Sequence, residues 1–284
     1  MTSIRALLIV VLTAAATACA PTPPASLTDP VQLQTPPADW TAADQPVIWN
    51  SFDEAAQLEL SMPDAVKTQP KLYSLLRREG VAELRAFGRD ARQALNEMGA
   101  DARTPYTQTI GYLEPFETAG LFSLQGGSWS YTGGAHGNPS DIAVLWDKAR
   151  QRRIAPADLF AAGADLTILD RALCDAVNAA KLERARGENA SGPWDPVSLT
   201  PAQGEMWSCP RAVNMAVSLA PGTVPGKAGG LIVGIGPYVV GPYVEAGYSI
   251  LIPLDAFAAL LSPVWADQFA GAPDPALVQS HRAG

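Results

Sequence analysis

Two kinds of hydrophobic periodicity alternate along residues 58–261 and limit the folds open to this chain. In several short segments apolar side chains recur at every second residue, which is typical of a half-buried strand. These segments are residues 58–62, 106–112 and 213–219. Residues 121–131, 142–146, 231–235 and 248–252 are further strand candidates. Two longer segments instead repeat every three or four residues, as an amphipathic helix does. They are residues 71–98, which form one helix or a pair broken near Gly80, and residues 166–184.

Strands in adjacent runs around two helices predict an α+β fold with mainly antiparallel sheets. Residues 255–261 are expected to add a short C-terminal helix. We expect an N-terminal α+β subdomain over residues 45–118 and a C-terminal one over residues 119–264. Residues 265–284 are expected to form a flexible tail. A chain of 284 residues is long enough to bury a sizeable core.

The first 18 residues have the features of a secretory signal peptide, because Arg5 precedes the apolar stretch 6–16. Cys19 follows Ala18 directly, as in a bacterial lipobox, where the thiol is lipidated and becomes the new N-terminus. The usual leucine three places before the cysteine is Ala16 here, and Ala16 with Ala18 would also suit an ordinary signal peptidase. A lipid anchor on Cys19 is our main hypothesis, and a free secreted protein is the alternative.

Residues 19–44 are expected to form an extended tether between that anchor and the domain. Proline at high density forbids helix and removes donors from any sheet. The prolines are Pro21, Pro23, Pro24, Pro30, Pro36 and Pro37. The expected partner of the anchor is a lipid bilayer. Ala20 follows the cysteine, where an aspartate would indicate retention at the inner membrane, so the periplasmic face of the outer membrane is the default location.

Few residues of this chain could ligate a metal. It has three cysteines and two histidines, and no zinc site of the usual spacing can be assembled from them. We therefore expect no metal and no cofactor. In an oxidising compartment the two remaining cysteines, Cys174 and Cys209, are expected to form a disulfide, with two buried free thiols as the alternative.

The charge balance argues against one class of partner. The chain has 20 Lys+Arg against 28 Asp+Glu, a net charge of −8, and no block of basic residues. General nucleic-acid binding needs clustered cations, so no nucleic-acid partner is expected.

The segment whose residue types best suit binding or catalysis is 131–139, YTGGAHGNP. Its glycines permit a sharp turn and a close approach of the backbone. One interpretation is a loop that presents side chains or backbone amides to a ligand, and the other is a structural hairpin in which His136 hydrogen-bonds to its own loop. The ligand-loop candidates are Tyr131, Gly133, Gly134, His136 and Asn138.

This segment resembles the signature of the extracellular domain of the lysozyme-sensing anti-sigma-V factors. The same domain is found upstream of the catalytic domain in a peptidoglycan deacetylase. Segment 154–160 (IAPADLF) is similar to a further block of that family, as are 236–247 (GPYVVGPYVEAG) and 248–254 (YSILIPL). The resemblance covers residues 57–261 and adds Tyr238 and Tyr243 to the ligand-loop candidates.

The resemblance implies a sensor-like binding module rather than the full activity of either relative. This sequence shows no sigma-binding segment with a membrane helix and no separate deacetylase domain, so sigma-factor control and deacetylation are not carried over. The implied ligand is a lysozyme-like protein or a peptidoglycan fragment. Because lysozymes are typically strongly basic, a net charge of −8 favours such a pair.

The alternative function is a glycan hydrolase or a deacetylase-like enzyme of the cell envelope. His136 would be its base, oriented by Asp141 or Asp147, with Ser128 or Ser130 close in sequence. The serine spacing of a nucleophile elbow, G-x-S-x-G, does not occur around Ser128. Binding without catalysis is therefore our main hypothesis, with His136 and Asp147 as the catalytic candidates if the chain is an enzyme.

Overall fold

The structure is a computed structural model that describes residues 47–99, 104–186, 198–200 and 206–282. All of them belong to one compact unit, Leu33–Gly284. The signal peptide, Cys19 and the tether of residues 19–44 lie outside the described residues. None of the helices in the described ranges is long and apolar enough to cross a membrane.

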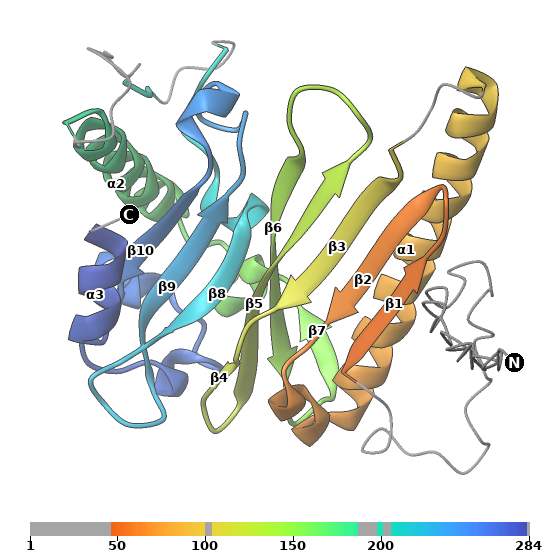
Figure 1. Cartoon of the computed structure of the whole chain (residues 1–284). Helices are drawn as coiled ribbons and strands as arrows, with labels where there is room; N and C mark the ends of the chain where they lie inside the picture. The colour runs from red at the N-terminus through yellow and green to blue at the C-terminus, as the bar shows by residue number, and fades with distance from the viewer. Residues whose placement is uncertain (1–46, 100–103, 187–197, 201–205, 283–284) are drawn as a thin grey trace, which may run out of the picture. The chain divides into compact units, whose positions relative to one another are not determined.

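The fold is α+β, with two long helices, a short C-terminal helix and mainly antiparallel sheets, as the sequence predicted (Figure 1). The helices are α1 (Pro70–Met98), α2 (Thr167–Arg186) and α3 (Pro275–Arg282). The strands are β1 (Ile48–Phe52), β2 (Ala56–Ser61), β3 (Tyr106–Tyr112), β4 (Phe116–Glu117), β5 (Leu121–Tyr131), β6 (Asn138–Asp147), β7 (Arg152–Ile154), β8 (Ala216–Pro221), β9 (Ala228–Ile235) and β10 (Tyr248–Pro253).

The first seven strands form sheet A, in the order β1-β2-β3-β5-β6-β7 with β4 beside β5. Among the described strands of this sheet, β2 and β3 alone pair in parallel, because α1 connects them as a crossover. Sheet A combines strands from both predicted subdomains, and the boundary between those subdomains stays a prediction.

The last three strands form the antiparallel sheet B, in the order β10-β9-β8. Sheet B packs against β5 and β6, where the backbone N–H of Leu219 donates a hydrogen bond to Ser123 Oγ at 2.9 Å. The other side of sheet B is covered by α2, which runs beside β10 (Figure 1). The layers are therefore α1, sheet A, sheet B and α2.

Alternate residues of β5 divide between two hydrophobic cores. Phe122 and Leu124 belong to a first core between sheet A and α1, whereas Leu121 belongs to a second core between the sheets and α2. The largest members of the first core include Leu60, Leu72, Tyr73, Leu76, Leu84 and Trp146. This division follows from the two-residue period of a strand.

The first helix is continuous, which decides between the two alternatives that the sequence left open, because Gly80 lets α1 lie against β2: a Cβ at Gly80 would be 3.0 Å from Leu60 Cδ1. The helices differ from the sequence-based expectation in two other places. The short helix expected over residues 255–261 is instead two single-turn 3-10 helices, Leu254–Ala256 and Ala258–Leu260. The short C-terminal helix is α3, within the segment 265–284 that the sequence predicted to be a flexible tail.

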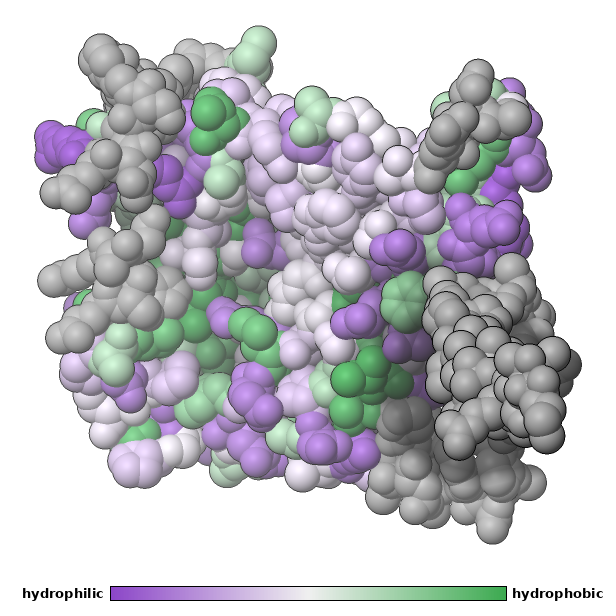
Figure 2. Space-filling model, in the orientation of Figure 1, coloured by the Kyte–Doolittle hydropathy of each residue, from purple (hydrophilic) through white to green (hydrophobic). Residues whose placement is uncertain are grey.

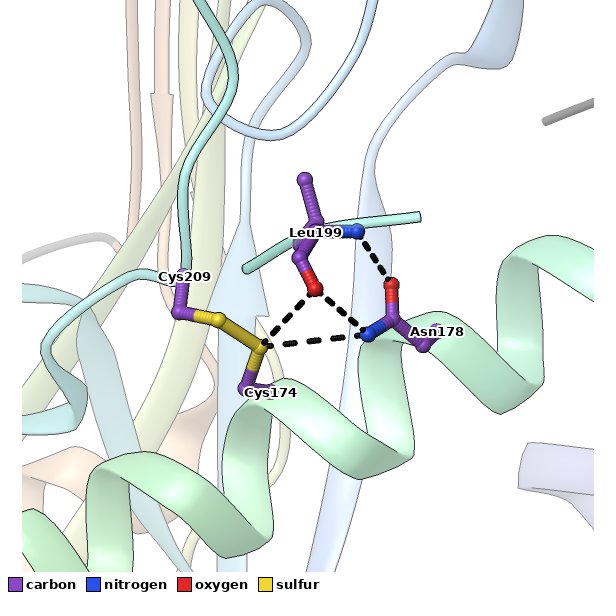
Figure 3. Close-up of a disulfide and its surroundings, with 4 residues drawn as sticks. All are labelled: Cys174, Asn178, Leu199 and Cys209. Carbon is purple, nitrogen blue, oxygen red and sulfur yellow. Dashed lines mark hydrogen bonds between the residues drawn. A yellow bond between two sulfur atoms is a disulfide. The ribbon is translucent and has the colours of Figure 1, made fainter. Parts of the chain in front are cut away.

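The predicted disulfide between Cys174 and Cys209 is confirmed (Figure 3). It joins α2 to the segment before β8, with 5.2 Å between the Cα atoms. Beside it, Asn178 holds Leu199: its Nδ2 donates to Leu199 O at 3.1 Å, and its Oδ1 accepts from Leu199 N at 2.8 Å. Closing a loop of 35 residues stabilises the native state by roughly 3–4 kcal/mol in the chain-entropy model.

Candidate ligand-binding surface

The glycines of the β5–β6 loop form the sharp turn that the motif predicted. Gly133 and Gly134 have φ values of 89° and 95°, in the left-handed region that favours glycine. The Tyr131 hydroxyl donates a hydrogen bond to Gly134 O at 3.0 Å and ties the end of β5 to this turn. Asn138, which is exposed, begins β6 opposite Ser130.

Gly137 is the buried residue at which three parts of the surface meet. A Cβ at this position would lie 2.3 Å from Trp129 Cε2, so only glycine lets the indole of Trp129 lie against the loop. The carbonyl of Gly137 accepts a hydrogen bond from the Tyr243 hydroxyl at 2.8 Å, and His136 Nδ1 lies 3.0 Å from the same oxygen. The motif predicted a close backbone approach but not that Gly137 would provide it.

The two motifs that the sequence singled out are brought together, although about 100 residues separate them. The His136 ring stacks on the Tyr243 ring with 3.6 Å between centroids and 15° between planes. Tyr238 lies 5.5 Å from Tyr243 and is 53% exposed. Val239 and Val244 each follow one of these tyrosines in the chain and are also exposed. We call these five residues the aromatic loop surface.

A buried ion pair fastens this surface to α2. Lys181 Nζ lies 3.0 Å from Glu245 Oε2 and also donates to Val240 O at 2.6 Å. Both charged side chains are at most 2% exposed. Gly241 lies directly against the Glu245 carboxylate, where a Cβ would be 2.4 Å from its Cδ. Buried charges need a partner, so this pair fixes the course of the loop.

Arg184 holds the end of the same loop. Its guanidinium donates hydrogen bonds to Glu245 O and to Gly247 O, and it lies 4.0 Å from the centre of the Tyr248 ring. The Tyr248 hydroxyl donates to Glu245 Oε2 at 2.9 Å. Burial, together with the Glu245 carboxylate, raises the pKa of Tyr248 far above its usual range. The sequence reasoning missed Lys181 and Glu245; a lysine amid the apolar stripe of α2 was the available signal.

The structure does not assemble the catalytic candidates. His136 lies just before the ten-residue strand β6, and Asp147 is the last residue of that strand. Among the described residues, no carboxylate or serine hydroxyl forms a hydrogen bond with His136. The register of β5 and β3 puts Ser128 and Ser130 opposite Ile110 and Gln108, on the α1 side of sheet A.

Asp147 instead caps the β6–β7 turn. Its carboxylate accepts hydrogen bonds from the backbone N–H groups of Ala149 and Arg150 and from the Arg150 guanidinium, at 2.8–3.0 Å. Burial alone would raise the pKa of Asp147, but these bonds and the Arg150 charge hold it below its usual value. Within the described ranges, no three His, Cys, Asp or Glu side chains are grouped so that they could hold a metal ion.

Fold and surface together define an α+β domain of two packed sheets with aromatic residues on two adjoining loops. No family model matches the sequence, and no curated protein matches it. Two of the solved structures that match distantly are members of one family. A DUF3298 family protein from Pseudomonas aeruginosa PAO1 has a TM-score of 0.47 and 16% identity, over 81% of this chain and 99% of that one.

The second is a member of the same family from Bacteroides fragilis, with a TM-score of 0.49 and 15% identity over 78% of this chain and 94% of that one. The resemblance to the extracellular domain of the anti-sigma-V factors stays a prediction.

Proposed function

We propose that this chain is a lipid-anchored binding module of a bacterial cell envelope, and that it binds a lysozyme-like protein without catalysis. The observation that carries the proposal is the aromatic loop surface. His136 and Tyr238 are exposed and Tyr243 is half-buried, yet the loop behind these rings is fixed by the buried pair Lys181–Glu245. A surface that is ordered before binding loses little conformational entropy on association.

The composition of this surface suits a protein ligand. Tyr238, Val239 and Val244 are 53%, 40% and 79% exposed, and Tyr238 lies beside Tyr243, whose ring stacks on that of His136. Tyrosines surrounded by apolar contacts are frequent among residues that dominate protein–protein binding energy. The net charge of −8 attracts a basic partner such as a lysozyme.

A peptidoglycan fragment is the second candidate ligand, because aromatic rings also stack on sugars. Catalysis at His136 is not part of the proposal, since its ring stacks on Tyr243 and Asp147 caps a distant turn. The membrane anchor rests on Cys19 and the tether of residues 19–44, and the proposed location is the periplasmic face of the outer membrane. Mass spectrometry of the mature N-terminus would show an acylated Cys19, which a Cys19→Ser variant should lack.

A calorimetric titration of the full-length chain in detergent with lysozyme tests the binding function. We expect saturable binding with a Kd that is micromolar or tighter, weakened as salt rises because charged surfaces are screened. The double variant Tyr238→Ala/Val244→Ser should bind about tenfold or more weakly. Val264→Ser is the matched control, since Val264 is an exposed valine outside this surface. Absence of binding, or equal binding by both variants, would refute the proposal.

A further inference from the structure

One part of sheet A carries no second layer among the described residues. Leu58, Leu60 and Ile110 point into the core beneath α1, so their neighbours along β2 and β3 point the other way. Sheet B contacts β5 and β6, and leaves this opposite face over β1, β2, β3 and the second half of β5 uncovered. On β1, Ile48 and Phe52 are 53% and 59% exposed there. We call this area the open face.

The middle of the open face is occupied by two paired glycines. Gly111 of β3 pairs with Gly127 of β5, and the next pair on the same face is Thr109 with Trp129. Because neither glycine has a side chain, the surface is low at this pair. Figure 2 shows the same region as a pale band of near-neutral hydropathy across the middle of the view, where Figure 1 places β3 and β5.

Two aromatic rings form one wall of this low area. Trp129 and Tyr131 follow each other on the same face of β5, with 6.1 Å between their centroids and only 13° between their planes. Trp129 is 39% exposed and is held from one side by Gly137. Two nearly parallel, fixed rings provide apolar faces against which the ring of a sugar can stack.

The polar groups around the rings are almost all uncharged. Register places the side chains of Asn50, Gln57, Ser61, Thr107 and Thr109 on the open face. Within this face, among the described strands β1, β2, β3 and β5, Glu59 is the charged residue. Hydroxyl and amide groups donate and accept hydrogen bonds with the hydroxyls of a neutral polymer. A strongly charged ligand would find no complementary charge here.

A carboxylate stands where the open face meets sheet B. Asp141 of β6 pairs with Gly127, and Gly234 of β9 makes room for it, since a Cβ at Gly234 would be 2.8 Å from Asp141 Cβ. Burial raises the pKa of Asp141 above its ordinary value. Its two oxygens can accept hydrogen bonds from neighbouring hydroxyls of one ligand.

We infer that the open face binds a neutral polysaccharide, of the chemical kind found in the glycan strands of a cell wall, with sugar rings stacked on Trp129 and Tyr131. The inference rests on the proposed function for the envelope location, and it assigns the glycan ligand to a surface of its own next to the aromatic loop surface. The domain would then hold a glycan on its sheet while its loops contact a protein.

The probe is an N-acetylglucosamine hexamer, titrated calorimetrically into the full-length chain in detergent, with sedimentation of purified peptidoglycan as a second assay. We expect saturable binding that Trp129→Ala weakens about tenfold or more, because the stacking surface is lost. Trp129→Phe keeps a ring and should recover most of the affinity. Thr109→Val keeps the side-chain shape, removes one hydroxyl and should weaken binding several-fold. Circular dichroism confirms that each variant folds.

Val264→Ser is the matched control, because it changes an exposed residue outside both the aromatic loop surface and the open face. It should leave glycan binding unchanged, whereas Thr109→Val should weaken glycan binding and leave lysozyme binding unchanged. Lysozyme binding without hexamer binding would overturn the inference and leave the proposed function standing. Hexamer binding insensitive to Trp129→Ala and Thr109→Val would also overturn it. So would dimerisation that Trp129→Ala abolishes, since that would assign the face to a second copy of the chain.

Discussion

The two faces of sheet A are built from alternate residues of the same strands and have opposite compositions. Toward α1 the side chains include Leu58, Leu60 and Ile110, each at most 4% exposed. On the open face the paired positions are glycine, threonine and tryptophan. The face toward α1 stabilises the fold by packing in the first core. Because the open face contributes little to either core, its residues are available for a ligand.

The same contrast holds between the solvent side of the loops and the side that packs on α2. On the solvent side, the rings of His136, Tyr238 and Tyr243 contact one another and are accessible to water. Behind them, Lys181 and Glu245 are buried and paired. Exposed elements that must keep one shape need support from residues that no ligand touches. Substitutions behind the surface should therefore change stability most, and substitutions in front should change it least.

The largest effect is expected from Lys181→Met. The variant leaves Glu245 buried without its partner and should lower the free energy of unfolding by about 3–5 kcal/mol. Urea denaturation followed by circular dichroism measures this. The control is Arg153→Met, which removes an ion pair with Glu79 whose side chains are 43% and 48% exposed. The control should cost less than about 1 kcal/mol. Equal losses would show that the buried pair does not hold the loop.

Leu60→Ala compares the two faces directly. Leu60 is fully buried against Gly80 of α1, so truncation leaves a cavity and should cost about 2–5 kcal/mol of unfolding free energy. Ser61→Ala, one residue further along β2 and on the open face, should stay within about 0.5 kcal/mol. Both values come from the midpoint and slope of urea denaturation. A loss at Ser61 as large as that at Leu60 would mean that the open face is covered in solution.

Gly137→Ala tests the contact between the loop and Trp129. The added Cβ would lie 2.3 Å from Trp129 Cε2, so the indole or the loop has to move, at a cost of about 1–3 kcal/mol. The movement should change the near-ultraviolet circular dichroism of tryptophan. Thr132→Ala, an exposed change in the same loop, is the control and should leave both the spectrum and the stability unchanged. An unaltered spectrum for Gly137→Ala would contradict the packing described here.

Much of the fold could be predicted from local periodicity. The strand at residues 121–131 has the predicted bounds, and both long helices were found, because these segments repeat a clear two-residue or three-to-four-residue pattern over their length. Residues 255–261 have apolar residues at helical spacing, yet form 3-10 turns. A segment this short takes its shape from tertiary packing, which includes the buried Phe257 and Leu260.

The sequence identified the two motifs of the candidate site, but it did not show that they lie together. The glycines of residues 131–139 and the tyrosines of residues 236–247 were recognised from sequence, but nothing local shows that His136 stacks on Tyr243. The open face was missed for a similar reason. Gly111, Thr109 and Trp129 become one surface only through the pairing of β3 with β5, which the sequence does not specify.

The smallest effect is expected from Asp141→Asn, at the border between the open face and sheet B. Burial raises the pKa of Asp141 above its ordinary value of 3.8. The folded chain therefore binds the proton of the Asp141 carboxyl group more tightly than the unfolded chain does. The resulting stabilisation is complete below the unfolded pKa and is lost as the pH rises through the folded pKa. Asparagine does not ionise, so the variant loses nothing over that range.

Between about pH 4 and pH 7, Asp141→Asn should therefore become more stable than the wild-type protein, by less than about 1 kcal/mol because the side chain is partly exposed. Urea denaturation at a series of pH values measures the difference. Asp165→Asn is a control of opposite sign, because hydrogen bonds from Thr167 lower the pKa of Asp165. That variant should be the less stable one at neutral pH, with the difference vanishing in acid. A destabilised Asp141→Asn variant at neutral pH would show that the carboxylate has a stabilising partner in solution, and that it is not free to accept hydrogen bonds from a glycan.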